Sequence, residues 1–241
     1  MKRAGERGEG KWQRISWDAA LDTIVGKIKQ AREAYGPESI AFTFCDGERG
    51  NRAPGCALMH AIGSPMICGT DAHYCLRPQA VSCMVTFGQG NFFTGHNGFD
   101  FANSKCILIW GANLFESQMS KGKEISKALK NGAKLIVIDP RFTNMAAKAA
   151  LWLQVRPATD GALALGMINY IIEQGLYDKG FVDKYCYGFE QLRERAREYP
   201  LEKVSEITWV PVEAIRQAAT IYTTEKPATL ALYMGVAMNT N

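Results

Sequence analysis

The sequence lacks several features that would define its class at once. It has no apolar run of the roughly 18 residues that a membrane-spanning helix needs, so we predict no transmembrane segment. Charge of neither sign dominates: 28 Lys and Arg stand against 24 Asp and Glu, a net charge of +4. The basic residues are spread along the chain, which argues against nucleic acid as a partner. With 47% apolar and 22% charged residues, the 241-residue chain is typical of globular proteins rather than disordered ones.

The seven cysteines contain no C-x-x-C pair, and their number is odd. This argues against a zinc ribbon, a thioredoxin motif and a simple disulfide framework. The three histidines, His60, His73 and His96, have no metal-binding spacing with one another. We therefore expect a reduced protein in which most thiols pack as small apolar groups.

A complete dinucleotide fingerprint of the NAD type is also missing. In the G-x-G formed by Gly88 and Gly90, Phe93 occupies the position of the third glycine. That stretch also follows a predicted helix rather than a strand. A plain NAD-binding domain is therefore disfavoured.

What the sequence does contain is an alternation of apolar strands and helices from residue 105 onwards. Continuous apolar runs that are buried on both faces indicate parallel strands joined by right-handed crossovers. The fold class is therefore α/β, with a Rossmann-like parallel sheet. The predicted strands are 105–110, 134–138, 151–155 and 228–233, and the predicted helices are 114–130, 160–174, 178–185, 189–198 and 211–222.

The first part of the chain predicts a piece of a second, mixed α/β domain. Apolar residues recur at helical spacing after Ser16, a good N-cap, and Gly36-Pro37 ends this helix. A buried strand is expected at 39–45 and a short helix at 54–62, followed by an irregular loop that runs to Cys75. We place this incomplete domain at residues 1–65 and the Rossmann-like domain at residues 66–241.

Small and polar residues follow each predicted strand. Ligands of open parallel sheets bind beyond the carboxyl ends of the strands, and glycine lets a pyrophosphate approach the backbone N–H groups. Four such clusters on one sheet edge favour a large nucleotide, although the same residue types also cap helices and form turns. The candidates are Gly111, Asn113, Asp139, Arg141, Asp160, Gly161, Met234 and Gly235.

Cys75 differs from the other cysteines by its position. It ends the glycine-containing loop and precedes a predicted helix, with Pro78 three residues on. A helix N-terminus favours the thiolate, and a soft sulfur ligand suits a redox metal. The alternative is an ordinary packed cysteine.

With the loop cysteine and the strand-end motifs in this order, the chain resembles the molybdopterin oxidoreductases of the dimethyl sulfoxide reductase superfamily. The resemblance extends over nearly all of the sequence. Within the family, the later helical part is similar to acetylene hydratase, and thiosulfate or polysulfide reductase-like members share the cysteine. The matching stretches are WQRISWDAALDTI (12–24), YGPES (35–39), Cys75-x-x-Pro78, NGAKLIVIDPRFT (131–143) and ATDGALALGMINYI (158–171).

The resemblance implies a cofactor and assigns roles to residues. Cys75 falls where the family places the protein ligand to the metal, which makes it the catalytic and metal-binding candidate. The cofactor is a bis-molybdopterin guanine dinucleotide carrying molybdenum or tungsten, and the strand-end residues fall on stretches that line one dinucleotide. Glu116 and Ser117 are added to these as neighbours of the dinucleotide.

The resemblance also sets expectations about the whole protein. We expect a fragment that is inactive alone, with a [4Fe-4S] cluster in an N-terminal domain that is absent from the sequence. The partners are a small-molecule substrate and an electron-transfer subunit, and the compartment is the cytoplasm or the periplasm. A hydro-lyase of the acetylene hydratase kind, using the same cofactor, and a non-catalytic cofactor-binding module both stay open as alternatives to an oxidoreductase.

Overall fold

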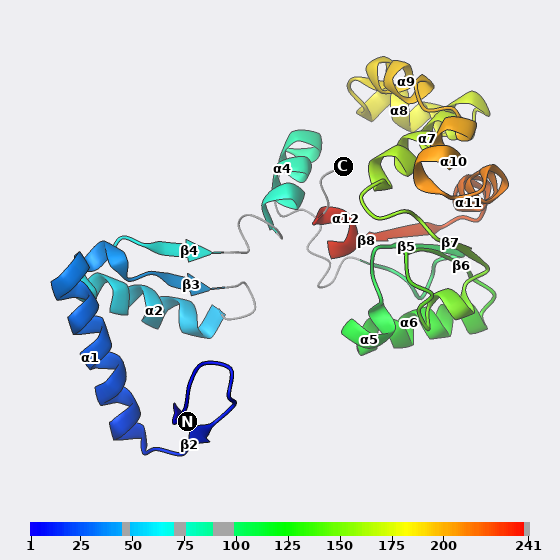
Figure 1. Ribbon diagram of the computed structural model, residues 1–241. Coiled ribbons are helices and arrows are strands. Elements are labelled where there is room, and N and C mark those ends of the chain that lie inside the picture. Colours follow the sequence, from blue (N-terminus) through cyan, green and yellow to red (C-terminus); the bar gives the residue numbers. More distant parts are fainter. Residues whose placement is uncertain (45–48, 70–75, 89–98, 239–241) are drawn as a thin grey trace. The chain divides into compact units, whose positions relative to one another are not determined.

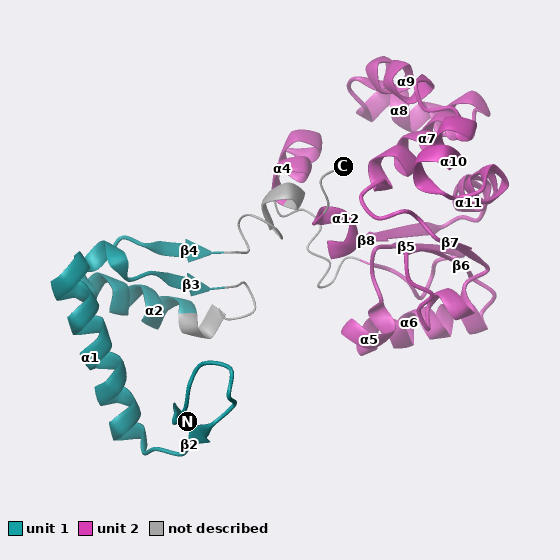
Figure 2. Cartoon of the chain, viewed as in Figure 1, with its two compact units in different colours: residues 1–77 teal, residues 78–241 magenta. Residues whose placement is uncertain are grey.

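The structure is a computed structural model that describes residues 1–241 except 45–48, 70–75, 89–98 and 239–241. The chain divides into two compact units, Met1–Arg77 and Pro78–Asn241 (Figure 2). Helix α4 (Leu76–Phe87) crosses the division. The predicted metal ligand, Cys75, lies outside the described residues.

Unit 1 is built on one long helix and a parallel strand pair (Figure 1). The predicted first helix is confirmed: Ser16 Oγ accepts a hydrogen bond from the Ala19 backbone N–H at 3.2 Å, and Gly36 ends the helix with a φ of 83°. Its apolar face, however, is not buried within the described structure: Leu21 and Ile24 are 54% and 55% exposed. The elements are β1 (Lys2–Arg3), β2 (Trp12–Gln13), α1 (Trp17–Tyr35), η1 (Pro37–Ser39), β3 (Phe42–Phe44), α2 (Arg49–Ile62) and β4 (Ile67–Gly69).

Two sequence predictions in unit 1 need correction. The segment after residue 65, which we expected to be an irregular loop, contains strand β4, because β3 supplies a parallel partner with Phe42 opposite Ile67. A partner 25 residues away leaves no local pattern in the sequence. The strand expected over 39–45 is shorter, and among its described residues only Phe44 is buried.

Unit 2 carries a four-stranded parallel sheet, and it confirms the predicted Rossmann-like α/β class. The strand order is β7-β6-β5-β8. Strands β5 and β6 pair with Cys106 opposite Lys134, and β5 and β8 pair with Cys106 opposite Ala228. The strands are β5 (Cys106–Trp110), β6 (Lys134–Ile138), β7 (Leu151–Leu153) and β8 (Ala228–Leu232).

The longer helices of unit 2 follow the predicted alternation, with exceptions. The helix expected over 114–130 is broken at Gln118, whose φ of −142° is not helical. Helix α10 was not predicted as a separate element. The remaining elements are α5 (Leu114–Ser117), α6 (Met119–Lys130), η3 (Ala146–Lys148), α7 (Asp160–Glu173), α8 (Lys179–Tyr185), α9 (Phe189–Arg197), α10 (Leu201–Thr208), α11 (Val212–Thr224) and α12 (Met234–Ala237).

Helices cover both faces of this sheet, so every residue of β5 is buried (Figure 1). Alternate residues point to opposite faces. Leu108 and Trp110 pack toward α7, α10 and α11, whereas Ile107 and Ile109 pack toward α5 and α6. These three layers explain why the strands read as continuous apolar runs rather than alternating ones.

No described helix combines the length and apolar character that crossing a membrane requires.

Candidate functional site

The strand order reverses between β5 and β8. Strands β6 and β7 follow on one side of β5, while β8 returns to its other side after the crossover through α7, α10 and α11. Gly111 directly follows β5, and the Gly235 backbone N–H donates to the Gly111 carbonyl at 3.1 Å. The two glycines thus lie at the topological switch point, where open α/β sheets bind ligands.

A cavity of about 340 Å³ lies at the carboxyl edge of the sheet. It is formed by the segments that follow β5, β6, β7 and β8, so residues far apart in sequence meet there. Six of the ten predicted cofactor residues line it. They are Gly111, Asn113, Asp139, Arg141, Asp160 and Gly235, and the other lining residues are Ala112, Ile138, Pro140, Val155 and Pro157.

Asn113 carries a buried amide that is not used within the described fold. Both side-chain atoms, Nδ2 and Oδ1, are shielded from solvent and form no hydrogen bond with any described residue. A buried polar group without a partner costs about 1–3 kcal/mol. The Asn113 amide lines the cavity and can both donate a hydrogen bond to a polar ligand and accept one from it.

Asp160 is the buried acidic group of the cavity. It is the first residue of α7 and only 5% exposed, and its Oδ1 accepts a hydrogen bond from the Trp110 indole N–H at 2.6 Å. The positive end of the helix dipole stabilises a carboxylate at this position. Asp160 therefore presents an acceptor to the cavity without a neighbouring cation among the described ion pairs.

Asp139 and Arg141 form a tight turn directly after β6. Asp139 Oδ1 accepts the Arg141 backbone N–H at 2.8 Å, and the Asp139 carbonyl accepts the Trp152 indole N–H at 2.9 Å. The turn itself is thereby fixed, while the Arg141 side chain is exposed. The exposed Arg141 guanidinium can form a bidentate pair with a phosphate.

Four predicted cofactor residues are not among those that line the cavity. Glu116 and Ser117 lie on α5 and are exposed, and Ser117 Oγ donates to the Asn113 carbonyl at 3.0 Å. Gly161 follows Asp160 in α7, and Met234 begins α12. Among the described residues, no group of three or more His, Cys, Asp or Glu side chains could hold a metal ion.

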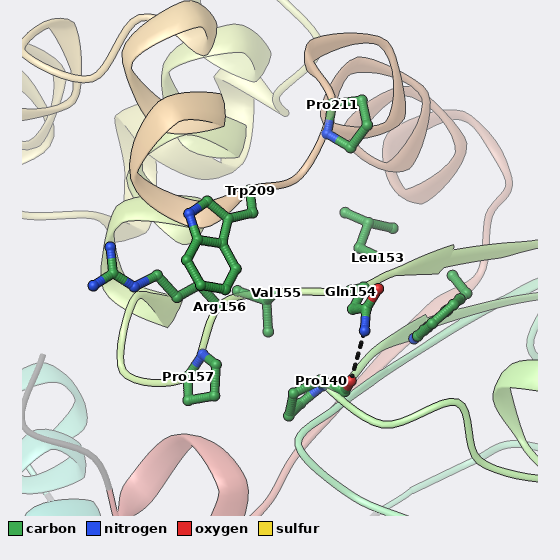
Figure 3. A pocket seen from close by; sticks show the side chains of 9 residues that line it. Pro140, Leu153, Gln154, Val155, Arg156, Pro157, Trp209 and Pro211 are labelled. Carbon is green, nitrogen blue, oxygen red and sulfur yellow. Dashed lines mark hydrogen bonds between the residues drawn. The ribbon is translucent and has the colours of Figure 1, made fainter.

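A second cavity, of about 480 Å³, was not expected from the sequence and shares Pro140, Val155 and Pro157 with the first. The Arg156 guanidinium lies 5.0 Å from the ring centroid of Trp209 (Figure 3). Trp209 has a φ of 64°, which favours glycine. This pair brings together two turns more than 50 residues apart, so no residue spacing could have revealed it.

The parallel sheet with helices on both faces, the glycine contact at its switch point and the polar cavity beside it define an α/β unit of the doubly wound type, which binds ligands at this edge. The chain belongs to the molybdopterin oxidoreductase family, whose model matches residues 1–240. The resemblance recognised from the sequence motifs is thereby confirmed.

Individual relatives agree with this membership. Acetylene hydratase of Syntrophotalea acetylenica is 42% identical over 245 residues, covering 100% of this chain and 32% of the relative. The thiosulfate reductase molybdopterin-containing subunit of Salmonella typhimurium is 35% identical, covering 89% and 27%, respectively. The dimethyl sulfoxide reductase of Haemophilus influenzae is 37% identical, covering 79% and 25%.

A solved structure supports the same fold. Acetylene hydratase from Pelobacter acetylenicus superposes with a TM-score of 0.68 at 41% identity, over 97% of this chain and 32% of that one. The chain therefore spans about a third or less of the length of the relatives that it matches.

Proposed function

We propose that this chain forms part of the cofactor-binding region of a molybdenum or tungsten enzyme that uses a bis-molybdopterin guanine dinucleotide. The observation that supports the proposal most is the convergence of six predicted residues on one cavity that also contains the unpartnered Asn113 amide. These residues come from the ends of all four strands of the sheet. A ligand that uses them all must be long and carry both phosphate and polar ring edges.

The residues present fit one guanine dinucleotide. Gly111 and Gly235 line the cavity without side chains that would cover their backbone, Arg141 supplies a cation for a pyrophosphate, and Asp160 offers an acceptor to a base. When bound, the cofactor supplies a metal that cycles between two oxidation states and performs the redox step. The chain's own residues bind and orient the nucleotide, and we assign the metal-ligand role to Cys75.

For the whole protein we propose an oxidoreductase that acts on a small molecule and receives electrons from a separate subunit. A [4Fe-4S] cluster in a further domain of the same polypeptide would complete the electron path. The names of the relatives, dimethyl sulfoxide reductase and thiosulfate reductase, support this class of reaction.

The test is metal analysis of the natural polypeptide that contains this chain, purified without oxygen. We expect about one molybdenum or tungsten atom and about four iron atoms per polypeptide. The Cys75→Ala variant should lose the activity and change the metal's spectrum while Cys56→Ala, which removes a thiol of helix α2, changes neither. Zinc alone, or no metal, in the unchanged polypeptide contradicts the proposal.

A hydro-lyase is the second candidate, because acetylene hydratase is 42% identical to the whole chain. Incubation of the natural polypeptide with acetylene and no electron acceptor separates the two. Water addition to acetylene at an unchanged metal oxidation state supports the hydro-lyase. A substrate that changes the metal's oxidation state supports the oxidoreductase.

A further inference from the structure

The Asp160 carboxylate is held by one side chain, and that side chain is not part of the cavity. Within the described part of the chain, the Trp110 indole N–H is the side-chain donor to Asp160, at 2.6 Å from Oδ1. No described residue donates to Oδ2. Asp160 lines the cavity, whereas Trp110 is not among the lining residues. One carboxylate oxygen is thus bound to the core while the residue itself faces the ligand space.

Trp110 is well placed to fix this geometry. It is the last residue of β5, 6% exposed and packed in the core beneath α7, α10 and α11. Its ring cannot turn without displacing that core, since protein interiors are close-packed. The hydrogen bond therefore sets the rotation of the carboxylate about its last torsion, which otherwise has broad freedom.

We propose that Trp110 is a positioning residue for base selection: by holding Oδ1 of Asp160, it directs the remaining carboxylate lone pairs to the adjacent N1–H and 2-amino donors of a guanine. The inference rests on the proposed function, because it assumes that a purine dinucleotide occupies this cavity. Adenine presents an acceptor at N1, and hypoxanthine lacks the 2-amino group. A site built to accept from both guanine donors discriminates against both of these bases.

The alternative is a purely structural role, in which the Trp110 indole only supplies a hydrogen bond to the buried Asp160 carboxylate. Burying this carboxylate without a partner would destabilise the fold. In that case, loss of the indole N–H lowers the stability of the fold but leaves base preference unchanged. The ratio of the affinities for two purine nucleotides distinguishes the two roles, because a general loss of stability lowers the affinity for both nucleotides equally.

The experiment uses the full 241-residue chain and three nucleotide probes, GDP, IDP and ADP, titrated by calorimetry. For the unchanged chain we expect GDP to bind at least about ten-fold more tightly than IDP or ADP, the weight of one charge-assisted hydrogen bond. Trp110→Phe removes the N–H and keeps an aromatic ring. This substitution should lower the affinity for GDP about ten-fold and bring the ratio of GDP to IDP affinity toward one, while the affinity for ADP changes little.

A matched control is available on strand β7 of the same sheet. Trp152 also donates its indole N–H, at 2.9 Å, but to the Asp139 carbonyl rather than to Asp160. Trp152→Phe should keep the GDP:IDP ratio of the unchanged chain. If Trp110→Phe fails to fold, benzothienylalanine at position 110 replaces only the N–H by sulfur and serves the same purpose.

The outcomes distinguish a failure of the Trp110 role from a failure of the proposed function. A Trp110→Phe chain that binds GDP with the unchanged preference over IDP overturns the role of Trp110 and leaves the proposed function standing. An unchanged chain that binds none of the three nucleotides overturns both. An equal loss of affinity for GDP and for ADP in Trp110→Phe also overturns the positioning role.

Discussion

Gly111 and Gly235 meet backbone to backbone at the point where the order of the sheet reverses. A Cβ atom on Gly111 would lie 2.9 Å from the Gly235 Cα, and one on Gly235 would lie 2.7 Å from the Gly111 Cα. Gly111 also has a φ of 66°. Both glycines line the cavity, so the contact sets how closely a ligand approaches the backbone between β5 and β8.

Substitution of Gly111 tests this contact, and the chain provides a close control. Gly175 has a φ of 65°, but nothing lies within 4 Å of the position of its Cβ. Gly175→Ala should therefore lose about 1 kcal/mol of unfolding free energy, the cost of the left-handed backbone. Gly111→Ala should lose roughly 2 kcal/mol more, because its methyl group meets backbone atoms. Urea unfolding measures both, and equal losses would show that the contact has no energetic weight.

The buried Asn113 amide predicts opposite effects on stability and on binding. Asn113→Leu removes two unsatisfied polar atoms, so the free chain should become about 1 kcal/mol more stable. GDP affinity should fall at least about ten-fold. Asn169 is the matched control: it is buried, but its Nδ2 donates to Glu173 Oε1 at 3.2 Å. Asn169→Leu should lose stability instead. A loss of stability in Asn113→Leu contradicts the account of that residue.

The fold should lose stability at high pH through Cys106. Burial, together with the nearby Glu225 carboxylate, raises the pKa of this thiol from 9.0 to about 11, and the Lys134 ammonium opposes the shift. Between these values the unfolded chain loses the thiol proton first, so stability falls as pH rises. In Cys106→Ala the fall between pH 9 and 11 should be shallower, by up to about 2 kcal/mol.

The measurement is urea unfolding across that pH range under reducing conditions. Cys186→Ala, which removes an exposed thiol, serves as the control and should keep the slope of the unchanged chain. A Cys106→Ala slope equal to that of the unchanged chain would mean that the buried thiol does not contribute.

Substitutions of Trp209 should measure how much its left-handed backbone conformation destabilises the fold. It ends α10 with a φ of 64°. Trp209→Gly and Trp209→Ala both remove the ring stacked on Arg156, so the difference between them isolates the backbone. We expect the glycine variant to be about 1 kcal/mol more stable than the alanine variant, measured by thermal unfolding. The reverse order would show that this conformation carries no strain.

Much of the fold could be predicted from local pattern. Strand β6 was predicted to the residue, because KLIVI is a continuous apolar run between Gly132 and Asp139-Pro140. Helix α1 was found from its cap at Ser16 and its stop at Gly36. Such elements carry their own boundary signals.

What could not be predicted depends on partners distant in sequence. Strand β4 exists because β3 pairs with it, and the Trp110–Asp160 hydrogen bond joins residues 50 positions apart. The strand-end residues could be predicted from their places in the sequence. Only the three-dimensional fold shows that Asn113 lines the cavity and that Glu116 does not. Their role in binding a cofactor stays a prediction.

Above all, we propose that this sheet edge binds a guanine dinucleotide. The most direct measurement is the amount and identity of nucleotide that acid hydrolysis releases from the natural polypeptide purified without oxygen. We expect GMP, about two per molybdenum or tungsten atom, with a clear loss in Asp160→Ala. Release of no nucleotide, or of AMP or CMP in place of GMP, would contradict it.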